Sequence, residues 1–418
     1  MTPSGYSQNP LIKDVGMSDP HARVFNNTIF LYTGHDDSPA DKKWVMKDWK
    51  IFSSTNLVNW TWQGTVSPKE NYMDDDSADC WASDAATRNG KYYFYFSDRT
   101  RGIGVMTSDN PEGPFKDALG KALVKPMHDP TLLIDDDPNQ TPYIIYGQKR
   151  DSYHIAKLNN DMISVAETPK PIVITGEAWE NTPSWQDKNY LFKHDGLYYL
   201  SWGQSYATSS NVYGPYQSVG SVGKGYGLGA YAHGSFFWWK GQFYHVWCYY
   251  IRKGFKYRET IISYCHFEDG GKIHTDTEFL DKHFAYGVGR YEAAWPEIQA
   301  EWYYEISSGI KKQGNRAEGF VLTEIKDGSW VNFANVSFKK CPGKFSAKTF
   351  AKGGKGTLEV RIDSISGPLL GVYPISESGN TDQTETTQLS EVVGQKNVFL
   401  VFKGDKNCTF NLDWIKFQ

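Results

Sequence analysis

The chain has 418 residues, and its 44 Lys and Arg against 48 Asp and Glu give a formal net charge of −4. This balance argues against a nucleic-acid partner, because binding to phosphates needs a concentrated basic surface. No apolar stretch approaches the roughly 18 residues that a membrane span requires. Aromatic residues make up 16% of the chain, and that abundance favours many short strands over a bundle of helices.

A turn followed by a run of Tyr, Phe and Trp recurs along the first part of the chain, roughly every fifty to sixty residues, which is within the range of propeller blades. Large apolar and polar residues alternate in these runs, and Asn-Gly, Asp-Gly and Lys-Gly turns interrupt them, as in β-hairpins. Five units of four short strands predict an all-β chain that begins with a five-bladed β-propeller. An irregular β-sandwich is the alternative. The recurring segments are 26–34, 88–98, 139–148, 194–204 and 239–249.

The pattern changes near residue 296, at an Ala-Ala-Trp-Pro step. Beyond it the chain shows continuous alternation, Gly-rich turns and a final strand rich in aromatic residues, which are typical of a β-sandwich of the jelly-roll kind. We therefore expect two domains, a propeller over residues 1–296 and a sandwich over 297–418.

Acidic residues stand at the predicted entries of four blades, where the innermost strand of each blade begins. They are Asp19 in "SDPH", Asp84 in "WASDAAT", Asp129 in "HDPTLL" and Asp187 in "WQDKNY". If these entries converge on one end of the propeller axis, the carboxylates raise one another's pKa values, which supplies both a protonated acid and an ionised base near neutral pH. An isolated Ser-Asp-Pro would otherwise be read as a simple turn.

Aromatic residues close to these entries are candidates for stacking on the faces of sugar rings. Two carboxylates in an aromatic-lined pocket meet the requirements of glycoside hydrolysis. The aromatic candidates are Trp81, Trp185, Trp202 and Tyr231.

Residues 10–290 resemble the family 43 glycoside hydrolases, on the stretches "SDPHARVF…FLYTGHD", "CWASDAATRNGKYYFYFS" and "HDPTLLIDDD". The resemblance implies that Asp19 is the general base. It also implies that Asp129 orients the acid and tunes its pKa. Asp84, in a segment similar to the second blade of the family, is expected to contact the substrate.

The residue implied as the general acid departs from the family pattern. The family usually has Glu six residues before the Lys of "LFKHDGLYYL", and this chain has Asp187 there. An aspartate is one methylene shorter, so its carboxyl would lie about 1 Å farther back on the covalent geometry of the side chain. Glu177 or Glu180 would serve instead if their loop folded over the site. We favour Asp187.

Two further residues match the resemblance. His233, in "YAHGSFF", matches a family histidine near the axis that holds a water or a metal ion, and a buried structural histidine is the alternative. Arg258, in "KYRETII", is expected to bind a sugar hydroxyl unless it lies on a surface strand. Catalysis is expected to need no cofactor.

The chain from about residue 297 resembles a family 6 carbohydrate-binding module, on "IQAEWYYE", "GTLEVRIDSISGPLLG" and "FNLDWIKF". Such modules often carry a structural calcium ion, for which Glu301 and Asp413 are the expected ligands. The usual stacking Tyr is replaced near Glu324, and the late Trp-rich loop reads "SGNTDQTETTQ". Without aromatic faces, sugar stacking loses its main source of energy.

Together these features predict an inverting, exo-acting glycosidase that acts on plant polysaccharide or its oligosaccharides, first of all an α-L-arabinofuranosidase. β-Xylosidase, β-galactosidase and galactofuranosidase activities remain open, and so does a propeller that binds glycan without catalysis. The expected partner is the oligo- or polysaccharide substrate, and we expect a monomer. The chain opens without the apolar core of a signal peptide, so either the protein is cytosolic or a leader has been removed. For an enzyme that acts on plant polysaccharide we expect secretion or a periplasmic location, with the leader absent from this sequence.

Overall fold

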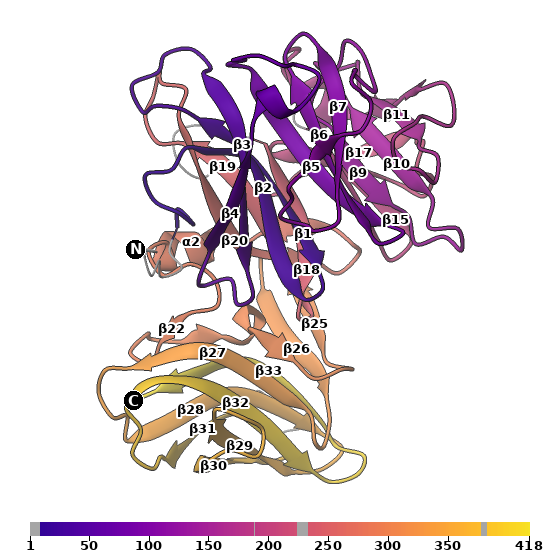
Figure 1. Ribbon diagram of the computed structural model, residues 1–418. Coiled ribbons are helices and arrows are strands. Elements are labelled where there is room, and N and C mark those ends of the chain that lie inside the picture. The colour runs from indigo at the N-terminus through magenta and orange to yellow at the C-terminus, as the bar shows by residue number, and fades with distance from the viewer. Residues whose placement is uncertain (1–8, 188, 224–232, 378–382) are drawn as a thin grey trace. The chain divides into compact units, whose positions relative to one another are not determined.

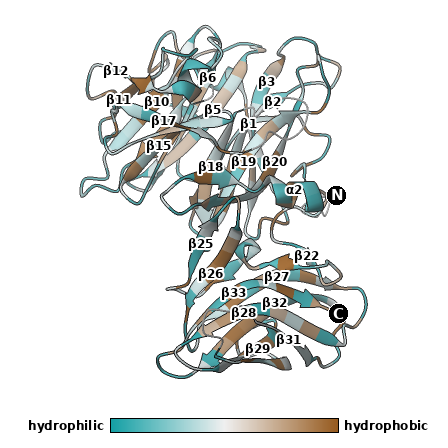
Figure 2. Cartoon of the chain, turned by 180° about the vertical axis from the view of Figure 1, so that it is seen from behind, coloured by the Kyte–Doolittle hydropathy of each residue, from teal (hydrophilic) through white to brown (hydrophobic). Residues whose placement is uncertain are grey.

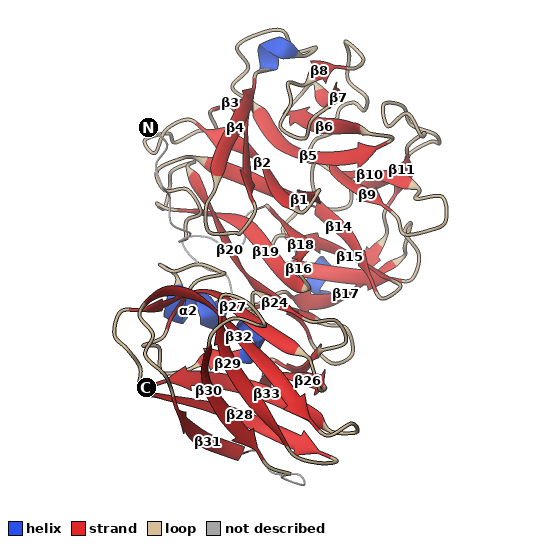
Figure 3. Ribbon diagram, turned by 60° about the horizontal axis from the view of Figure 1, so that its bottom comes forward, coloured by secondary structure: helices blue, strands red, loops and turns tan. Residues whose placement is uncertain are grey.

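The computed structural model describes residues 9–187, 189–223, 233–377 and 383–418, and its regular structure is almost entirely β (Figure 3). Two compact units form. The first comprises Met1–Phe237, Tyr244–Ser263 and Thr275–Ala285, and the second comprises Trp238–Phe243, Tyr264–His274 and Tyr286–Gln418. The units therefore do not divide the chain at one point, and the boundary expected at residue 296 stays a prediction. None of the described helices is long and apolar enough to cross a bilayer.

In the described part of the chain, five sheets follow one another before residue 276, and strands that are consecutive in the chain are mostly neighbours in each sheet (Figure 1). The first sheet contains β1 (Met17–Phe25), β2 (Thr28–Asp36), β3 (Met46–Ser54) and β4 (Thr61–Val66). The second contains β5 (Cys80–Arg88), β6 (Lys91–Asp98), β7 (Gly102–Ser108) and β8 (Lys116–Asp117). The third contains β9 (Thr131–Ile134), β10 (Pro142–Tyr146), β11 (His154–Lys157) and β12 (Lys170–Pro171).

The fourth sheet contains β14 (Asn189–His194), β15 (Leu197–Trp202), β16 (Ser205–Ser209) and β17 (Tyr216–Ser221), and β13 (Ile174–Thr175) adds to it in parallel beside β17. The fifth contains β18 (Gly234–Trp239), β19 (Gln242–Tyr250), β20 (Arg258–Phe267) and β21 (Ile273–Thr275). The described helical segments are short: η1 (Pro68–Glu70), α1 (Glu177–Glu180), α2 (Thr277–His283) and η2 (Ala300–Trp302).

The first hairpin of four of the five sheets closes through a two-residue turn in which both residues have positive φ. Such turns match the right-handed twist of the flanking strands and favour Asn and Gly. This chemistry explains why "NN", "NG", "DG" and "KG" mark the hairpins in the sequence. The four turns are Asn26–Asn27, Asn89–Gly90, Asp195–Gly196 and Lys240–Gly241.

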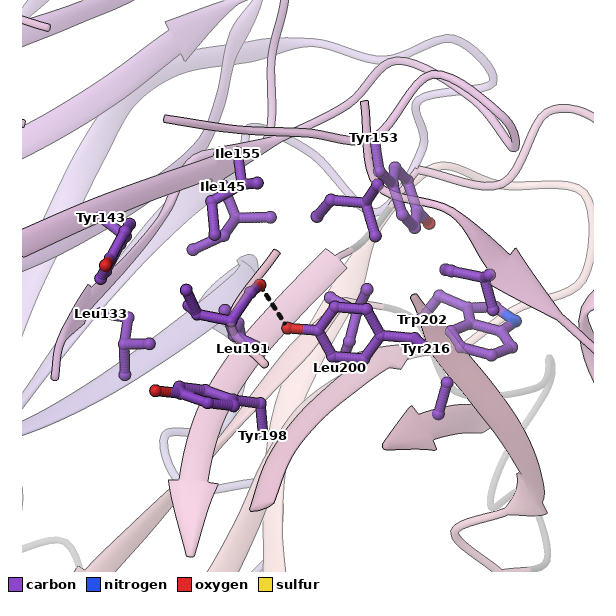
Figure 4. Packing of buried hydrophobic residues seen from close by; sticks show 14 of the residues in the cluster. Leu133, Tyr143, Ile145, Tyr153, Ile155, Leu191, Tyr198, Leu200, Trp202 and Tyr216 are labelled. Carbon is purple, nitrogen blue, oxygen red and sulfur yellow. Dashed lines mark hydrogen bonds between the residues drawn. The ribbon is translucent and has the colours of Figure 1, made fainter. Parts of the chain in front are cut away.

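Aromatic and branched side chains fill the space between neighbouring sheets. Between the third and fourth sheets, for example, Leu133 and Ile145 pack in one cluster with Leu191, Leu200 and Tyr216 (Figure 4). Figure 2 shows hydrophobic residues concentrated along the strands. Burial of this apolar area holds the sheets together, and the first strands β1, β5, β9 and β14 contact one another in succession.

Hydrogen bonds join the first sheet, and the segment that precedes it, to the fifth sheet. The side chain of Asn9 donates to the carbonyl of Ile262 and accepts from its N–H, both at 2.9 Å. The Ser235 hydroxyl donates to the carbonyl of Pro20 and accepts from the N–H of Ala22, both at 3.0 Å. The two ends of the propeller segment are thus held side by side, which closes the ring of sheets.

A buried ion pair joins the first three sheets at their inner strands. Asp84 on β5 is fully buried, and Arg23 on β1 donates to both of its carboxylate oxygens, with Nε 2.8 Å from Oδ1. Arg23 also donates to the carbonyl of Leu132 on β9 at 2.7 Å, and the Leu132 N–H donates to Asp84 at 2.7 Å. Burial raises the pKa of Asp84, but the charges of Arg23 and His21, together with the hydrogen bonds from Arg23 and the Leu132 N–H, outweigh burial and keep the pKa below its usual value.

The second unit contains two further sheets, which form a β-sandwich. One contains β22 (Tyr291–Glu292), β24 (Glu305–Ile306), β27 (Trp330–Phe338), β29 (Gly356–Ile362), β30 (Leu369–Ile375) and β32 (Gly394–Gly404). The other contains β23 (Ile298–Gln299), β25 (Lys311–Asn315), β26 (Gly319–Ile325), β28 (Lys344–Lys352), β31 (Gln383–Gln388) and β33 (Thr409–Phe417).

We predict that Arg23→Leu lowers the free energy of unfolding by on the order of 3–5 kcal/mol, because it leaves Asp84 buried without its counter-charge. Chemical denaturation measures the loss. The control is Arg101→Leu, which removes a partly exposed pair with Asp75 and should cost about 0–1 kcal/mol. Equal losses in the two variants would contradict a stabilising role for the buried pair.

Candidate active site

A cavity of about 920 Å³ lies within the first unit, and three carboxylates line it: Asp19, Asp129 and Asp187. They come from three different sheets. Asp19 is in β1, Asp129 directly precedes Pro130 and β9, and Asp187 lies shortly before β14. The convergence expected from the positions of the blade entries is therefore present for these three residues.

The two Asp-Pro steps share an unusual backbone. The φ of Asp19 is 50° and that of Asp129 is 57°. Asp tolerates this left-handed region better than most residues do, and strained residues of this kind cluster at functional sites. At Asp19 the strand pairing between β1 and β2 also shifts, between Ser18 and His21. A bulge of this kind re-aims a side chain, and here it turns Asp19 to the cavity.

Arg258 at the start of β20 holds Asp19. Its Nη1 donates to Asp19 Oδ1 at 2.9 Å, while its Nε and Nη2 each donate to Asp36 at 2.9 Å. Burial raises the pKa of Asp36, against the opposing charge of Arg258. Arg258 is 4% exposed and lines the cavity, so it is not a surface-strand residue. Its donors are directed to carboxylates, and Asp19 is thereby held in one orientation.

Asp129 is a buried carboxylate whose pKa is raised. It is 4% exposed, and burial, followed by the negative charge of Asp187, raises its pKa to about 6. His128 and His233 oppose this rise through their charge. A carboxyl with this pKa holds a proton well above the pH at which an ordinary aspartate ionises.

Asp187 is partly exposed, with 23% of its side chain accessible, and its Oδ2 lies 3.4 Å from Nε2 of His128. Glu177 and Glu180 on α1 are exposed, and neither lines the cavity. The structure thus brings Asp187, and not the two glutamates, into the group of carboxylates. His128 was not among the residues predicted for the site, although it stands in the "HDP" motif.

His233 lies beneath the cavity rather than in its lining. It is 1% exposed, and its Nδ1 is 3.7 Å from Asp19 Oδ1 and 3.9 Å from Asp129 Oδ2. Its Nε2 donates to the carbonyl of Asn189 at 3.2 Å. The imidazole therefore lies close to two of the carboxylates.

Aromatic side chains form much of the remaining wall. Trp185 is 65% exposed, whereas Trp202 is 3% exposed and donates from its indole to the Thr182 hydroxyl at 2.8 Å. Trp185 is therefore the better stacking surface, and Trp202 supports the segment that carries Asp187. Trp44 and Tyr250, which sequence reasoning missed, also line the cavity, with ring centroids 6.1 Å apart. Tyr231, another predicted aromatic, lies outside the described residues.

Asp84 is placed differently from the other predicted acids. The pairing of β5 with β6 shifts between Cys80 and Ser83, so the residues at the bulge of the second sheet are Trp81 and Ala82. Trp81 thus occupies the place that Asp19 has in the first sheet, and Trp81 lines the cavity. Asp84 lies farther along the strand, fully buried against Arg23. A direct contact between Asp84 and a substrate is not available in this structure.

Comparison with known proteins decides the family. The model of glycosyl hydrolases family 43 matches residues 7–273, and that of the family 6 carbohydrate binding module matches residues 299–418. The chain belongs to glycosyl hydrolases family 43. This family 43 glycoside hydrolase carries a family 6 module after its catalytic domain, and the predicted five-bladed propeller and β-sandwich are confirmed.

Relatives of this family 43 enzyme match nearly its whole length. An arabinoxylan arabinofuranohydrolase of Paenibacillus polymyxa is 27% identical over 97% of this chain and 74% of that protein. The one from Bacillus subtilis (strain 168) is 25% identical over 98% of this chain and 92% of that protein. A solved structure of a Bacillus subtilis family 43 arabinoxylan arabinofuranohydrolase with cellotetraose has a TM-score of 0.59 at 24% identity, covering 98% and 97% of the two chains.

The two residues expected to bind calcium in the family 6 module, Glu301 and Asp413, are not part of a cluster of possible metal ligands among the described residues. Glu301 in η2 is buried, and Asp413 on β33 accepts a hydrogen bond from Lys348 at 2.7 Å. Neither belongs to a described group of three metal-capable side chains, so calcium here stays a prediction. Such a group does occur at His128, Asp129 and Asp187, whose ligand atoms lie within 4.8 Å of one another. In this group burial lowers the pKa of His128, but the carboxylates of Asp129 and Asp187 outweigh burial and raise it above its usual value.

We predict that Asp129→Asn stabilises this enzyme at pH 7 by on the order of 3 kcal/mol, because the substitution removes a buried carboxylate. With its pKa raised to about 6, Asp129 binds its proton more tightly in the folded chain. Its contribution to stability is therefore present below about pH 4 and is lost as the pH rises through about 6. The gain from Asn should accordingly disappear near pH 4.

Thermal denaturation between pH 4 and pH 7 measures this difference. Asp195→Asn is the control, because the Asp195 side chain is 90% exposed and its replacement should leave the pH profile unchanged. A gain from Asp129→Asn that is the same at both pH values would contradict the raised pKa.

Proposed function

We propose that this enzyme is an inverting, exo-acting α-L-arabinofuranosidase that removes terminal arabinofuranosyl groups from arabinoxylan or its oligosaccharides. The observation that carries the proposal is the meeting of Asp19, Asp129 and Asp187 in one aromatic-lined cavity. The relatives named arabinoxylan arabinofuranohydrolases, which match 97% and 98% of this chain, support the choice of substrate.

Each carboxylate has a different environment and hence a different task. Asp19, oriented by Arg258, takes a proton from the attacking water on one face of the sugar. Asp187 gives a proton to the glycosidic oxygen on the other face as the bond to that oxygen breaks. In inverting enzymes the two carboxyl groups stand about 6.5–9.5 Å apart, which leaves room for the water. Asp129, buried beside Asp187, orients the acid and influences its charge.

The cavity fits a small part of a polysaccharide. Ligand pockets of about 300–1,000 Å³ accommodate a molecule of drug size, and at about 920 Å³ this one is near the upper limit. It has space for a terminal pentose and the first residues of the chain to which that sugar is attached. Trp44, Trp81 and Trp185 offer faces for stacking.

A β-xylosidase is the second candidate. A β-xylosidase of Xylanibacter ruminicola is 23% identical over 54% of this chain, and a β-D-galactofuranosidase of Aspergillus niger is 28% identical over 61%. A panel of aryl glycosides decides among them. Release from the α-L-arabinofuranoside above all others supports the proposal. A preference for the β-xyloside or the β-galactofuranoside would show that this sugar, and not arabinofuranose, is the substrate. Binding without turnover would favour a glycan-binding propeller.

Secretion or a periplasmic location follows from the substrate, because plant polysaccharide is met outside the cell. We also propose that the enzyme acts as a monomer, since all three carboxylates belong to one chain. For the family 6 module, glycan binding is a proposal as well. The loop 378–388, which reads "SGNTDQTETTQ" where such modules have a Trp-rich loop, lies partly outside the described residues.

We predict that Asp19→Asn lowers kcat on aryl α-L-arabinofuranosides by roughly 10²–10⁴-fold, which is the usual contribution of a general base. The fold should stay intact, as circular dichroism would show. Asp75→Asn is the control, since Asp75 pairs with Arg101 on the surface and does not line the cavity. A variant of Asp19 that retains most of its activity would identify this residue as a turn residue only.

We predict that Asp187→Asn harms substrates with poor leaving groups far more than aryl glycosides with good ones. A good leaving group needs little proton donation, so the loss of the acid costs it less. Steady-state rates on a series of aryl glycosides and on arabinoxylan oligosaccharides measure the dependence. Glu177→Gln and Glu180→Gln are the controls. If either glutamate variant showed this dependence and Asp187→Asn did not, the acid would come from α1.

A further inference from the structure

His128 is the buried side chain that lies against the proposed acid. It precedes Asp129 in the chain and is 6% exposed. Its ring packs edge-on against Trp81, with centroids 4.9 Å apart, and its Nε2 points to Asp187 Oδ2 at 3.4 Å. The contact with Trp81 fixes the plane of the imidazole, so the nitrogen that faces Asp187 is set by packing.

The charges around His128 favour its protonated form. Burial lowers the pKa of this imidazole, but the carboxylates of Asp129 and Asp187 outweigh burial and raise it above the usual value. Arg99 is the cation that acts against them. Farther off, His233 and Asp19 act on Asp129: the His233 Nδ1 lies 3.9 Å from Asp129 Oδ2, and the charge of Asp19 raises the pKa of Asp129. A cation held between two carboxylates, with a fixed ring plane, is arranged to donate a hydrogen bond.

The position of Asp187 gives this donor a task. The family resemblance places glutamate where this chain has Asp187, and the shorter side chain has one rotatable bond fewer with which to reach a glycosidic oxygen. When the acid gives up its proton, the electron pair of the breaking C–O bond stays on the leaving oxygen, and a full negative charge develops on the Asp187 carboxylate. A neighbouring imidazolium stabilises that charge more in the transition state than in the ground state.

We propose that His128 is a positioning residue that holds the Asp187 carboxyl toward the leaving group and stabilises its charge as the proton departs. This proposal rests on the proposed function, in which Asp187 is the general acid. The distance of 3.4 Å is longer than an ideal hydrogen bond. Catalytic hydrogen bonds are often long without substrate and shorten in the transition-state complex.

The first test needs no activity. The titration of the His128 imidazole is followed by NMR of histidine-labelled protein, with the resonance assigned by its loss in His128→Asn. In the wild type it should titrate at a higher pH than in Asp187→Asn, because the amide supplies no negative charge. An identical titration in the two proteins would overturn the pairing of His128 with Asp187, whether or not the enzyme hydrolyses an arabinofuranoside.

The second test is kinetic and uses His128→Asn and His128→Gln, which retain polarity without the positive charge. We expect kcat on substrates with poor leaving groups to fall by on the order of 10- to 100-fold, as for the loss of a hydrogen bond to a charged group. Good leaving groups should be little affected, and KM should stay close to that of the wild type. In the Asp187→Asn background, His128→Asn should add almost no further loss.

The matched control is His35→Asn. His35 pairs with Asp48 at 2.9 Å, and neither residue lines the cavity, so kcat should be unchanged for every leaving group. Equal losses of kcat for all leaving groups, or losses that add fully to those of Asp187→Asn, would overturn the positioning role of His128. If the wild type hydrolysed no glycoside of the panel, the proposed function would fail, and the NMR titration would still decide the pairing.

Discussion

The guanidinium of Arg258 lies between Asp19 and Asp36, and both the closed ring of sheets and the orientation of the proposed base depend on it. Arg258 opens β20 of the fifth sheet, while both carboxylates belong to the first. Breaking a buried ion pair on one side leaves an uncompensated charge, which is costly. The same contact that joins the last sheet to the first therefore also holds Asp19 in the cavity.

Around this contact, strand geometry brings the acids together. Asp19 lies at a β-bulge and Asp129 at a matching Asp-Pro step, both with positive φ. Backbone strain of this kind persists only where the surrounding structure over-determines it. Here the inner strands pack against one another, and Arg23 with Asp84 binds three of them together. The packed inner strands therefore hold the strained backbone of Asp19 and Asp129 in place.

The three carboxylates in the cavity differ because their neighbours differ. Asp19 has a guanidinium, Asp129 is buried against a like charge, and Asp187 is partly exposed beside an imidazole. Pairs of titratable groups whose environments separate their pKa values mark the acid and the base of a site. One cavity is thus lined by Asp19, which a guanidinium holds, and by Asp129 and Asp187, beside which His128 lies.

The sequence by itself indicated the sheets and the three acids that line the cavity. Alternation with a period of two and turns such as Asn89–Gly90 are local signals, and Asp19 and Asp129 share a local Asp-Pro motif. The positions of other site residues depend on pairing register and on contacts between sheets, and only the tertiary structure decided them. The bulge of β5 falls at Trp81–Ala82, so Trp81 lines the cavity, whereas Asp84 lies farther along the strand and is buried against Arg23. Register decides where each side chain points. Packing between separate sheets places His128 beside Asp187, which no spacing in the sequence encodes.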